Sequence, residues 1–229
     1  DNGLDVIVCP DDISPVVTIC IAVKTGATCE TPETNGLAHF YEHMFFKGNE
    51  ALPDQTAYNR RMGELGIIRN GTTATEKVQY FITLGSDRFR EGLEFMYDAI
   101  TSPLFDMEEM EREREVIMNE YSRGLSHPFH NLYRAREEVV YASAPWRQSA
   151  IGVPEVIQAA SPPAMHDFQE RYYTPDNSAL IIAGDVDYEE AFRMAEEEFS
   201  SWEYGGRSNY DSLPRLVSIP RDTTVYVDS

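Results

Sequence analysis

Apolar and polar positions along the chain follow two spacings, and each spacing predicts a different kind of secondary structure. Residues 4–8 and 16–24 are rich in Val and Ile and are separated by Asp and Pro residues, which predicts two strands joined by a short turn. A second pair of strands is predicted over residues 67–73 and 77–84, and a short buried strand over 180–183. The strands therefore occur in three groups along the chain.

Apolar residues three and four positions apart predict helices in most of the remaining chain. The predicted helices cover residues 37–46, 54–65, 86–100, 106–122, 128–141, 162–173 and 188–199. Ser86 is a suitable N-cap for the third of these helices, whereas residues 145–154 have the composition of a loop and residues 216–227 that of an extended segment. Strands and helices mixed in this way predict an α+β fold, a layered mixed β-sheet covered by helices.

The acidic composition narrows the classes of partner. Asp and Glu outnumber Lys and Arg by 39 to 19, which gives a formal charge of −20. Such a field repels a phosphate backbone, so we expect no nucleic-acid partner. The total charge fits both a solvated acidic surface and a preference for basic peptides, and it does not separate the two. No apolar run is long enough for a transmembrane segment.

The sequence does not determine the cellular compartment of the protein. Three cysteines are an odd number for so long a chain, so the sequence does not have a disulfide scaffold. No basic and apolar leader is visible at the start. Periplasmic or secreted and cytoplasmic locations therefore remain equally compatible with the sequence.

The segment with the clearest chemistry is His39-Phe40-Tyr41-Glu42-His43, in the first predicted helix. Residues four apart lie on the same side of a helix, so both imidazoles could bind one metal ion. Glu42 flanks the same side, and a carboxylate beside a zinc-bound water can accept its proton. The alternative interpretation is a solvated helix face, or histidines that hydrogen bond within the core.

A third zinc ligand must come from elsewhere in the chain, because a hydrolytic site usually has three protein ligands and an open position for water. The Glu-rich helix over 106–122 offers Glu113 and Glu120, which are seven residues apart on one stripe of the helix. A carboxylate on a partly apolar face requires a partner, and zinc would provide one. Most Glu residues on such a helix simply face water, which is the alternative for Glu120.

Two segments carry a resemblance to a known family. Residues 36–48, which contain the His-x-x-Glu-His motif, resemble the pitrilysin family of inverzincin metallopeptidases, which includes insulysin and mitochondrial processing peptidase. The run from Glu113 to Glu120 resembles the second motif of that family, at about the right distance. The likeness extends from residue 2 to about residue 200.

The resemblance implies a zinc-dependent endopeptidase. It assigns His39, His43 and Glu120 as the ligands of a zinc cofactor. It also assigns Glu42 as the general base that activates water, with Glu113 as a supporting residue of the catalytic site. The substrates that it implies are peptides or unfolded protein segments.

The same resemblance assigns a strand to substrate binding. Asn70, Gly71, Thr72 and Thr73 resemble the strand that pairs with an extended substrate through backbone hydrogen bonds. Two departures from the family pattern fall here, because residues 66–67 are Gly-Ile where the family has Gly-Gly, and Asn70 is followed by Gly where the family has Ala. These changes affect the fit of the substrate more than the binding of metal.

The resemblance also predicts the organisation of the protein. Residues 1–229 are expected to form a single N-terminal metal-binding lobe of the processing-peptidase (LuxS/MPP-like) type, with βα-repeat-like halves and a boundary near residues 145–160. We expect the C-terminal lobe to lie outside this chain, either in a longer form of the same chain or in a partner subunit, which would give a dimer. The alternatives are a non-catalytic or scaffolding lobe of a two-lobed peptidase-like assembly, and a metal-dependent hydrolase or lyase of another class.

Overall fold

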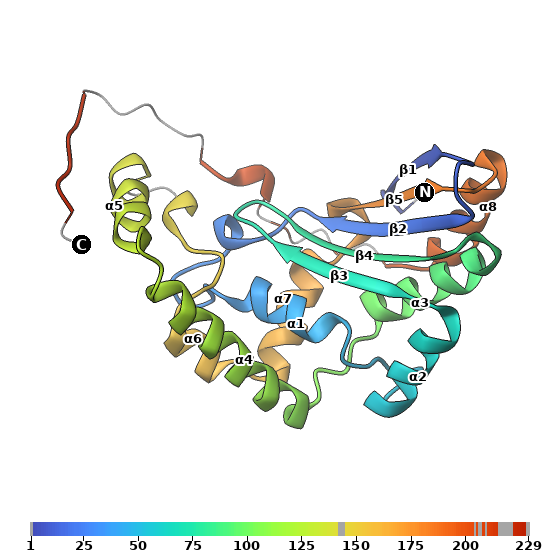
Figure 1. Ribbon diagram of the computed structural model, residues 1–229, viewed down its shortest axis with the longest axis horizontal. Coiled ribbons are helices and arrows are strands. Elements are labelled where there is room, and N and C mark those ends of the chain that lie inside the picture. Colours follow the sequence, from blue (N-terminus) through green and yellow to red (C-terminus); the bar gives the residue numbers. More distant parts are fainter. Residues whose placement is uncertain are drawn as a thin grey trace.

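A five-stranded mixed sheet is the framework of the computed structural model, which describes residues 2–141, 145–203, 205, 208, 210–214 and 222–227 (Figure 1). In spatial order the strands are β1 (Asp5–Pro10), β5 (Ser178–Gly184), β2 (Val16–Val23), β4 (Val78–Gly85) and β3 (Ile68–Thr73). β1 and β5 are parallel, and the other neighbours are antiparallel. β1 and β3 therefore form the two edges of the sheet.

The first two strands are present as predicted, but they are not neighbours in the sheet. β5 lies between them, with Ala179 opposite Asp5 of β1 and Gly184 opposite Val17 of β2. β5 is thus paired on both sides, which agrees with its apolar sequence. The hairpin predicted over 67–73 and 77–84 is confirmed as the antiparallel pair β3 and β4.

The helices follow the predicted segments closely. They are α1 (Leu37–Phe45), α2 (Gln55–Leu65), α3 (Phe89–Thr101), α4 (Met107–Leu125), α5 (His130–Val140), α6 (Pro154–Ala159), α7 (Pro162–Tyr172) and α8 (Tyr188–Phe199). Figure 1 shows α1, α4, α6 and α7 together on one side of the sheet. No helix of the described residues has the length and apolar character needed to cross a membrane.

The core lies between the sheet and these helices. Alternate residues of β2 and β4 are buried, because successive side chains of a strand point to opposite faces. The buried set is Val17, Ile19, Ile21 and Val23 from β2, and Val78, Tyr80, Ile82 and Leu84 from β4. Tyr80 stacks on Phe45 of α1 with ring centroids 3.7 Å apart. The fold is therefore the predicted one, a layered mixed sheet covered by helices.

Some local predictions were wrong. Ser86 does not cap an α-helix, since it begins a 3-10 turn (Ser86–Arg88) and its hydroxyl donates to Asp185 Oδ2 at 2.7 Å. α5 begins at His130 rather than at residue 128. The segment 145–154, predicted as a loop, contains a 3-10 turn over Pro145–Arg147, and its last residue begins the short helix α6, which was not predicted.

The extended segment predicted over 216–227 falls partly outside the described residues. Residues 216–221 are not described, and residues 222–227 are exposed and carry no assigned strand. The prediction is therefore not tested for the first half of this segment, and the second half pairs with no described strand.

Candidate metal centre

α1 presents the His-x-x-Glu-His segment, and its N-terminus is fixed from outside the helix. Gly36 precedes α1 with φ 117°, a left-handed conformation that favours glycine, and has no side chain to cap the helix. Glu30 takes that role from the preceding loop. Its Oε1 accepts from the Ala38 N–H at 2.7 Å, and its Oε2 accepts from the Gly36 N–H at 3.0 Å. This buried carboxylate satisfies N–H groups that a helix leaves unpaired at its start.

α4 packs beside α1 and brings a carboxylate to the two histidines. His39 Nε2 and His43 Nε2 are 3.3 Å apart, and Glu120 Oε2 lies 3.7 Å from the first and 3.6 Å from the second. Among the described residues, these three side chains are the one group of three or more that could hold a metal ion. The structure thus brings together the three residues expected to be zinc ligands.

The distances between these donor atoms fit zinc. A tetrahedral zinc ion with bonds of about 2.0–2.1 Å places its donor atoms about 3.3–3.4 Å apart. Two imidazoles and one carboxylate are also a donor set of catalytic zinc sites. Burial, and then the neighbouring His43, lower the pKa of His39 to about 4, so this ring is neutral at pH 7, as a metal ligand must be.

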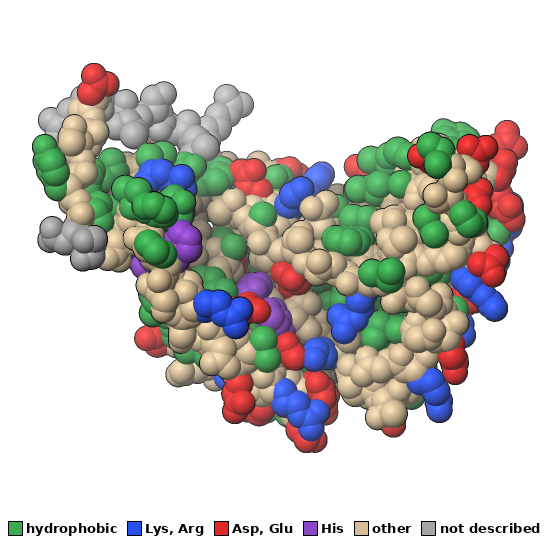
Figure 2. All heavy atoms as spheres, viewed as in Figure 1, with side chains coloured by type: hydrophobic (Ala, Val, Ile, Leu, Met, Phe, Trp, Pro, Cys, Tyr) green, Lys and Arg blue, Asp and Glu red, His purple; other side chains and the backbone are tan. Residues whose placement is uncertain are grey.

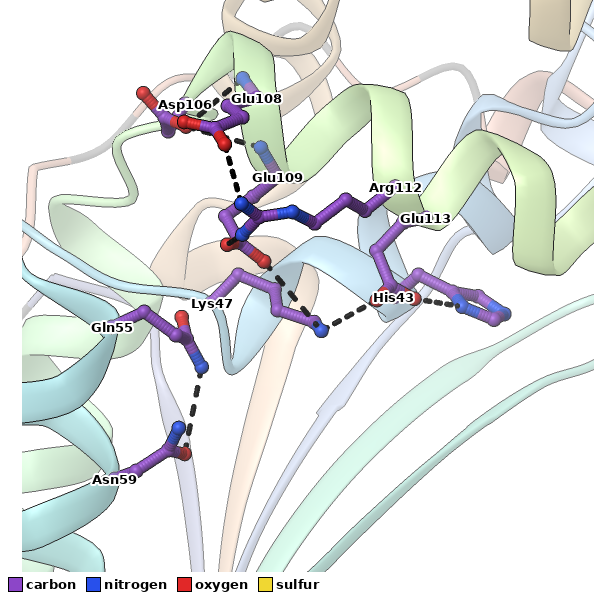
Figure 3. A network of polar contacts seen from close by, with 9 residues as sticks. All are labelled: His43, Lys47, Gln55, Asn59, Asp106, Glu108, Glu109, Arg112 and Glu113. Atoms are coloured by element: carbon purple, nitrogen blue, oxygen red, sulfur yellow. Dashed lines mark hydrogen bonds and ion pairs between the residues drawn. The ribbon is translucent and has the colours of Figure 1, made fainter.

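Glu113 lies behind His43 and orients its ring (Figure 3). Glu113 Oε2 is 2.8 Å from His43 Nδ1, so this nitrogen carries the proton and Nε2 is left with its lone pair toward the site. Glu113 Oε1 is 2.5 Å from Lys47 Nζ. Burial alone would raise the pKa of Glu113, but the hydrogen bonds from His43 and Lys47 outweigh it and lower the pKa.

Lys47 belongs to a longer chain of charges that continues along α4. Its Nζ is also 3.8 Å from Glu109 Oε2, and Glu109 pairs with Arg112 (Figure 3). The half-buried Lys47 therefore neutralises two carboxylates that α4 places against α1. Sequence analysis did not identify Lys47 or Glu30 as parts of the site.

Glu42 points toward the sheet rather than into the network around Glu113. The Thr73 hydroxyl of β3 donates to Glu42 Oε2 at 2.5 Å. Burial raises the pKa of the Glu42 carboxyl, and the hydrogen bond from Thr73 opposes this shift. A carboxylate with a raised pKa beside a metal site is suited to accepting and returning a proton.

The strand expected to bind substrate is at an edge of the sheet, so one side of its backbone has no neighbouring strand among the described residues. Thr73 and Gly71 lie opposite the buried Val78 and Tyr80, so they face the helices, whereas Asn70 and Thr72 face the other side. Asn70 Oδ1 accepts from the Gly71 N–H at 2.9 Å. The four residues therefore divide between the two faces of the sheet.

The three candidate zinc ligands differ in their exposure to solvent. Figure 2 shows histidine side chains in two places on the visible face, and acidic and basic side chains lie beside the lower of the two. The Glu120 side chain is 39% exposed, whereas those of His39 and His43 are 13% and 14% exposed. The carboxylate thus lies on the open side of the site, and the two imidazoles line its base.

Comparison with known proteins gives matches over nearly the whole chain. The sequence profile described as Insulinase (Peptidase family M16) matches residues 6–152, and the profile described as Peptidase M16 inactive domain matches residues 159–227. An uncharacterized zinc protease of Rickettsia bellii is 29% identical over 209 residues, which are 91% of this chain and 50% of that protein. The mitochondrial-processing peptidase subunit beta of Lentinula edodes is 26% identical over 224 residues, covering 98% and 47%.

Solved structures give the same picture of the fold. The crystal structure of a protease from Helicobacter pylori superposes with a TM-score of 0.82 at 24% identity, over 95% of this chain and 52% of that one. At this identity the similarity establishes the fold alone. The chain spans about half the length of the curated relatives that it matches first.

Proposed function

Because this chain belongs to the insulinase family of peptidases (Peptidase family M16), we propose that it is the metal-binding lobe of a zinc-dependent endopeptidase that cleaves peptides or unfolded protein segments. The observation that carries the proposal is the convergence of His39, His43 and Glu120, with donor atoms at distances that suit one zinc ion. The zinc proteases among its relatives support the same class of activity.

Each side chain then has a distinct role. A zinc ion held by His39, His43 and Glu120 would supply Lewis acidity, which acidifies a water molecule and polarises the scissile carbonyl. Glu42 accepts the proton of the attacking water and passes it to the leaving amine. Glu113 holds the His43 ring with Nε2 directed at the site.

The edge strand β3 is the expected docking place for the substrate. An extended peptide that pairs with the free side of residues 70–73 would lie beside α1, whose Glu42 contacts Thr73 of that strand. Binding of this kind depends on the extension of the peptide more than on its sequence. It favours peptides and unfolded segments, because a folded protein does not offer a free extended strand.

A second lobe completes the proposed enzyme. Residues 1–229 correspond to about half of the relatives, so we propose that they act as one N-terminal lobe, with the other lobe in the same longer chain or in a partner subunit. That lobe would cover the exposed side of the candidate metal site, where Glu120 lies, and hold the substrate against β3.

The test combines zinc analysis with peptide cleavage in the full natural protein. Glu42→Gln should leave about one zinc per chain and reduce cleavage by about 10²–10⁴-fold, the usual contribution of a general base. Glu115→Gln is the matched control, because Glu115 is an exposed carboxylate of α4 and its change should leave both quantities unaltered. A wild-type protein that binds zinc but cleaves no peptide would favour the scaffolding alternative, and full activity in Glu42→Gln would refute the role of the base.

A further inference from the structure

The inward face of β3 is directed at the helix that carries the candidate base. In the antiparallel pair of β3 and β4, directly opposite residues point to the same face of the sheet. Thr73 lies opposite Val78 and Gly71 lies opposite Tyr80, and both partners are fully buried under the helices. Thr73 and Gly71 therefore point toward α1, on the same side as Glu42.

Glu42 lies in a slot formed by these two residues. The Thr73 hydroxyl donates to Glu42 Oε2 at 2.5 Å, a length typical of a hydrogen bond to an ionised acceptor. A Cβ atom on Gly71 would lie 2.8 Å from Glu42 Cγ and 3.1 Å from its Oε1, so the strand approaches the side chain closely at this point. The position of the carboxylate is thus set by β3 and not by α1 alone.

Other members of the site do not hold Glu42 in this way. Glu113 contacts His43 and Lys47 instead. Glu120 and Glu42 are both carboxylates and repel each other when ionised. Thr73 is the residue that offers Glu42 a hydrogen-bond donor among the contacts described.

We propose that Thr73 is a positioning residue that holds the Glu42 carboxylate at the metal site, from the same strand on whose edge the substrate pairs. This inference rests on the proposed function. A substrate paired with β3 would also restrain Thr73, which orients the Glu42 carboxylate. Substrate binding and proton transfer would then both depend on this strand. The consequence of the inference is that loss of the Thr73 hydroxyl lowers kcat rather than substrate affinity.

The experiment measures kcat, KM, zinc content and thermal unfolding of the full natural protein with three changes at one position. Thr73→Val keeps the shape of the side chain but removes the hydroxyl, and Thr73→Ala removes the hydroxyl without adding a methyl group. Both should lower kcat by about 10–100-fold, the usual effect of losing an outer-shell partner, with KM within about 2-fold and zinc content unchanged. Thr73→Ser keeps the hydroxyl and should restore kcat to within about 3-fold of wild type.

Thr18→Val is the matched control. Thr18 of β2 hydrogen bonds to Thr83 at 2.8 Å on the outer face of the same sheet, so the change removes a Thr hydroxyl away from the site. It should leave kcat unaltered.

Unchanged kcat in both Thr73→Val and Thr73→Ala would overturn the inference, as would an effect on KM alone or no recovery of kcat in Thr73→Ser. If Glu42→Gln abolishes cleavage while Thr73→Val does not lower kcat, the proposed function stands and this inference alone fails. If the wild type cleaves nothing, both fail.

Discussion

Removal of the Glu30 carboxylate tests how the site is supported from outside its own helix. Glu30 is 5% exposed and accepts three hydrogen bonds, from the Ala38 N–H at 2.7 Å, the Gly36 N–H at 3.0 Å and Asn35 Nδ2 at 2.8 Å. No side chain of the helix itself caps α1. Glu30→Ala leaves all three donors without this acceptor, in a place that water reaches poorly.

The size of the effect follows from these contacts. A hydrogen bond contributes about 0.5–1.5 kcal/mol to stability, and a buried donor left unpaired costs about 1–3 kcal/mol. Asn35 Nδ2 keeps a second acceptor, the Ser149 carbonyl at 3.0 Å, so the free energy lost at this donor is at the low end of these ranges. We expect Glu30→Ala to lower the free energy of unfolding by about 3–5 kcal/mol. Glu30→Gln keeps one acceptor oxygen but turns an NH₂ group toward a donor, so its loss should be about 1–3 kcal/mol.

Chemical denaturation followed by circular dichroism measures both values. Glu50→Ala is the control, since Glu50 is an exposed residue of a loop and surface changes usually alter stability by less than about 0.5 kcal/mol. We expect the wild type to be the most stable, Glu30→Gln to be less stable, and Glu30→Ala to be the least stable. A loss below about 1 kcal/mol in Glu30→Ala would refute the reasoning, because it would mean that the three donors find other partners at little cost.

Three further changes test the support of the candidate ligands and the local packing of the backbone. Glu113→Ala removes the partner of His43 Nδ1 and should weaken zinc affinity by about 10–100-fold, measured by chelator competition, whereas Glu115→Ala on the exposed side of the same helix should not. Gly152→Ala places a Cβ atom 2.3 Å from a Cα atom at the start of α1, at φ +85°, and should lower the free energy of unfolding by about 2 kcal/mol or more. Gly63→Ala, in a helix with nothing within 4 Å, should raise it by about 0.5–1 kcal/mol. Equal stability of Gly152→Ala and Gly63→Ala would contradict the close backbone contact described at Gly152.

The helices and strands could be predicted from the sequence because local spacing determines which face of each segment is apolar. Tyr188–Phe199 was predicted with the same bounds, and Asp54 and Gly66 cap α2 at its two ends as their residue types indicate. The order of the strands could not be predicted in this way. Nothing in residues 4–24 indicates that a strand from the end of the fold lies between the first two.

The two candidate histidine ligands could be predicted from the sequence for the same reason, since the spacing of His39 and His43 is a local property of one helix. Glu120 required the resemblance to a family, because helical spacing alone offered both Glu113 and Glu120 as the third ligand. Lys47 and Glu30 were missed as parts of the site, and Thr73 was predicted only as a residue of the substrate strand and not as a partner of Glu42. Each acts across a tertiary contact, and a lone Lys, Glu or Thr has no spacing that would mark it.

The position of β5 in the sheet has a consequence for how the protein folds. β1 and β2 are synthesised first, but the strand that separates them is not complete until Gly184 has left the ribosome. Contacts between segments so distant in the chain form slowly, because a large loop must close before they contribute. Until then the nascent chain carries two apolar strands with unpaired edges, which is the stage at which chaperones would protect it from aggregation.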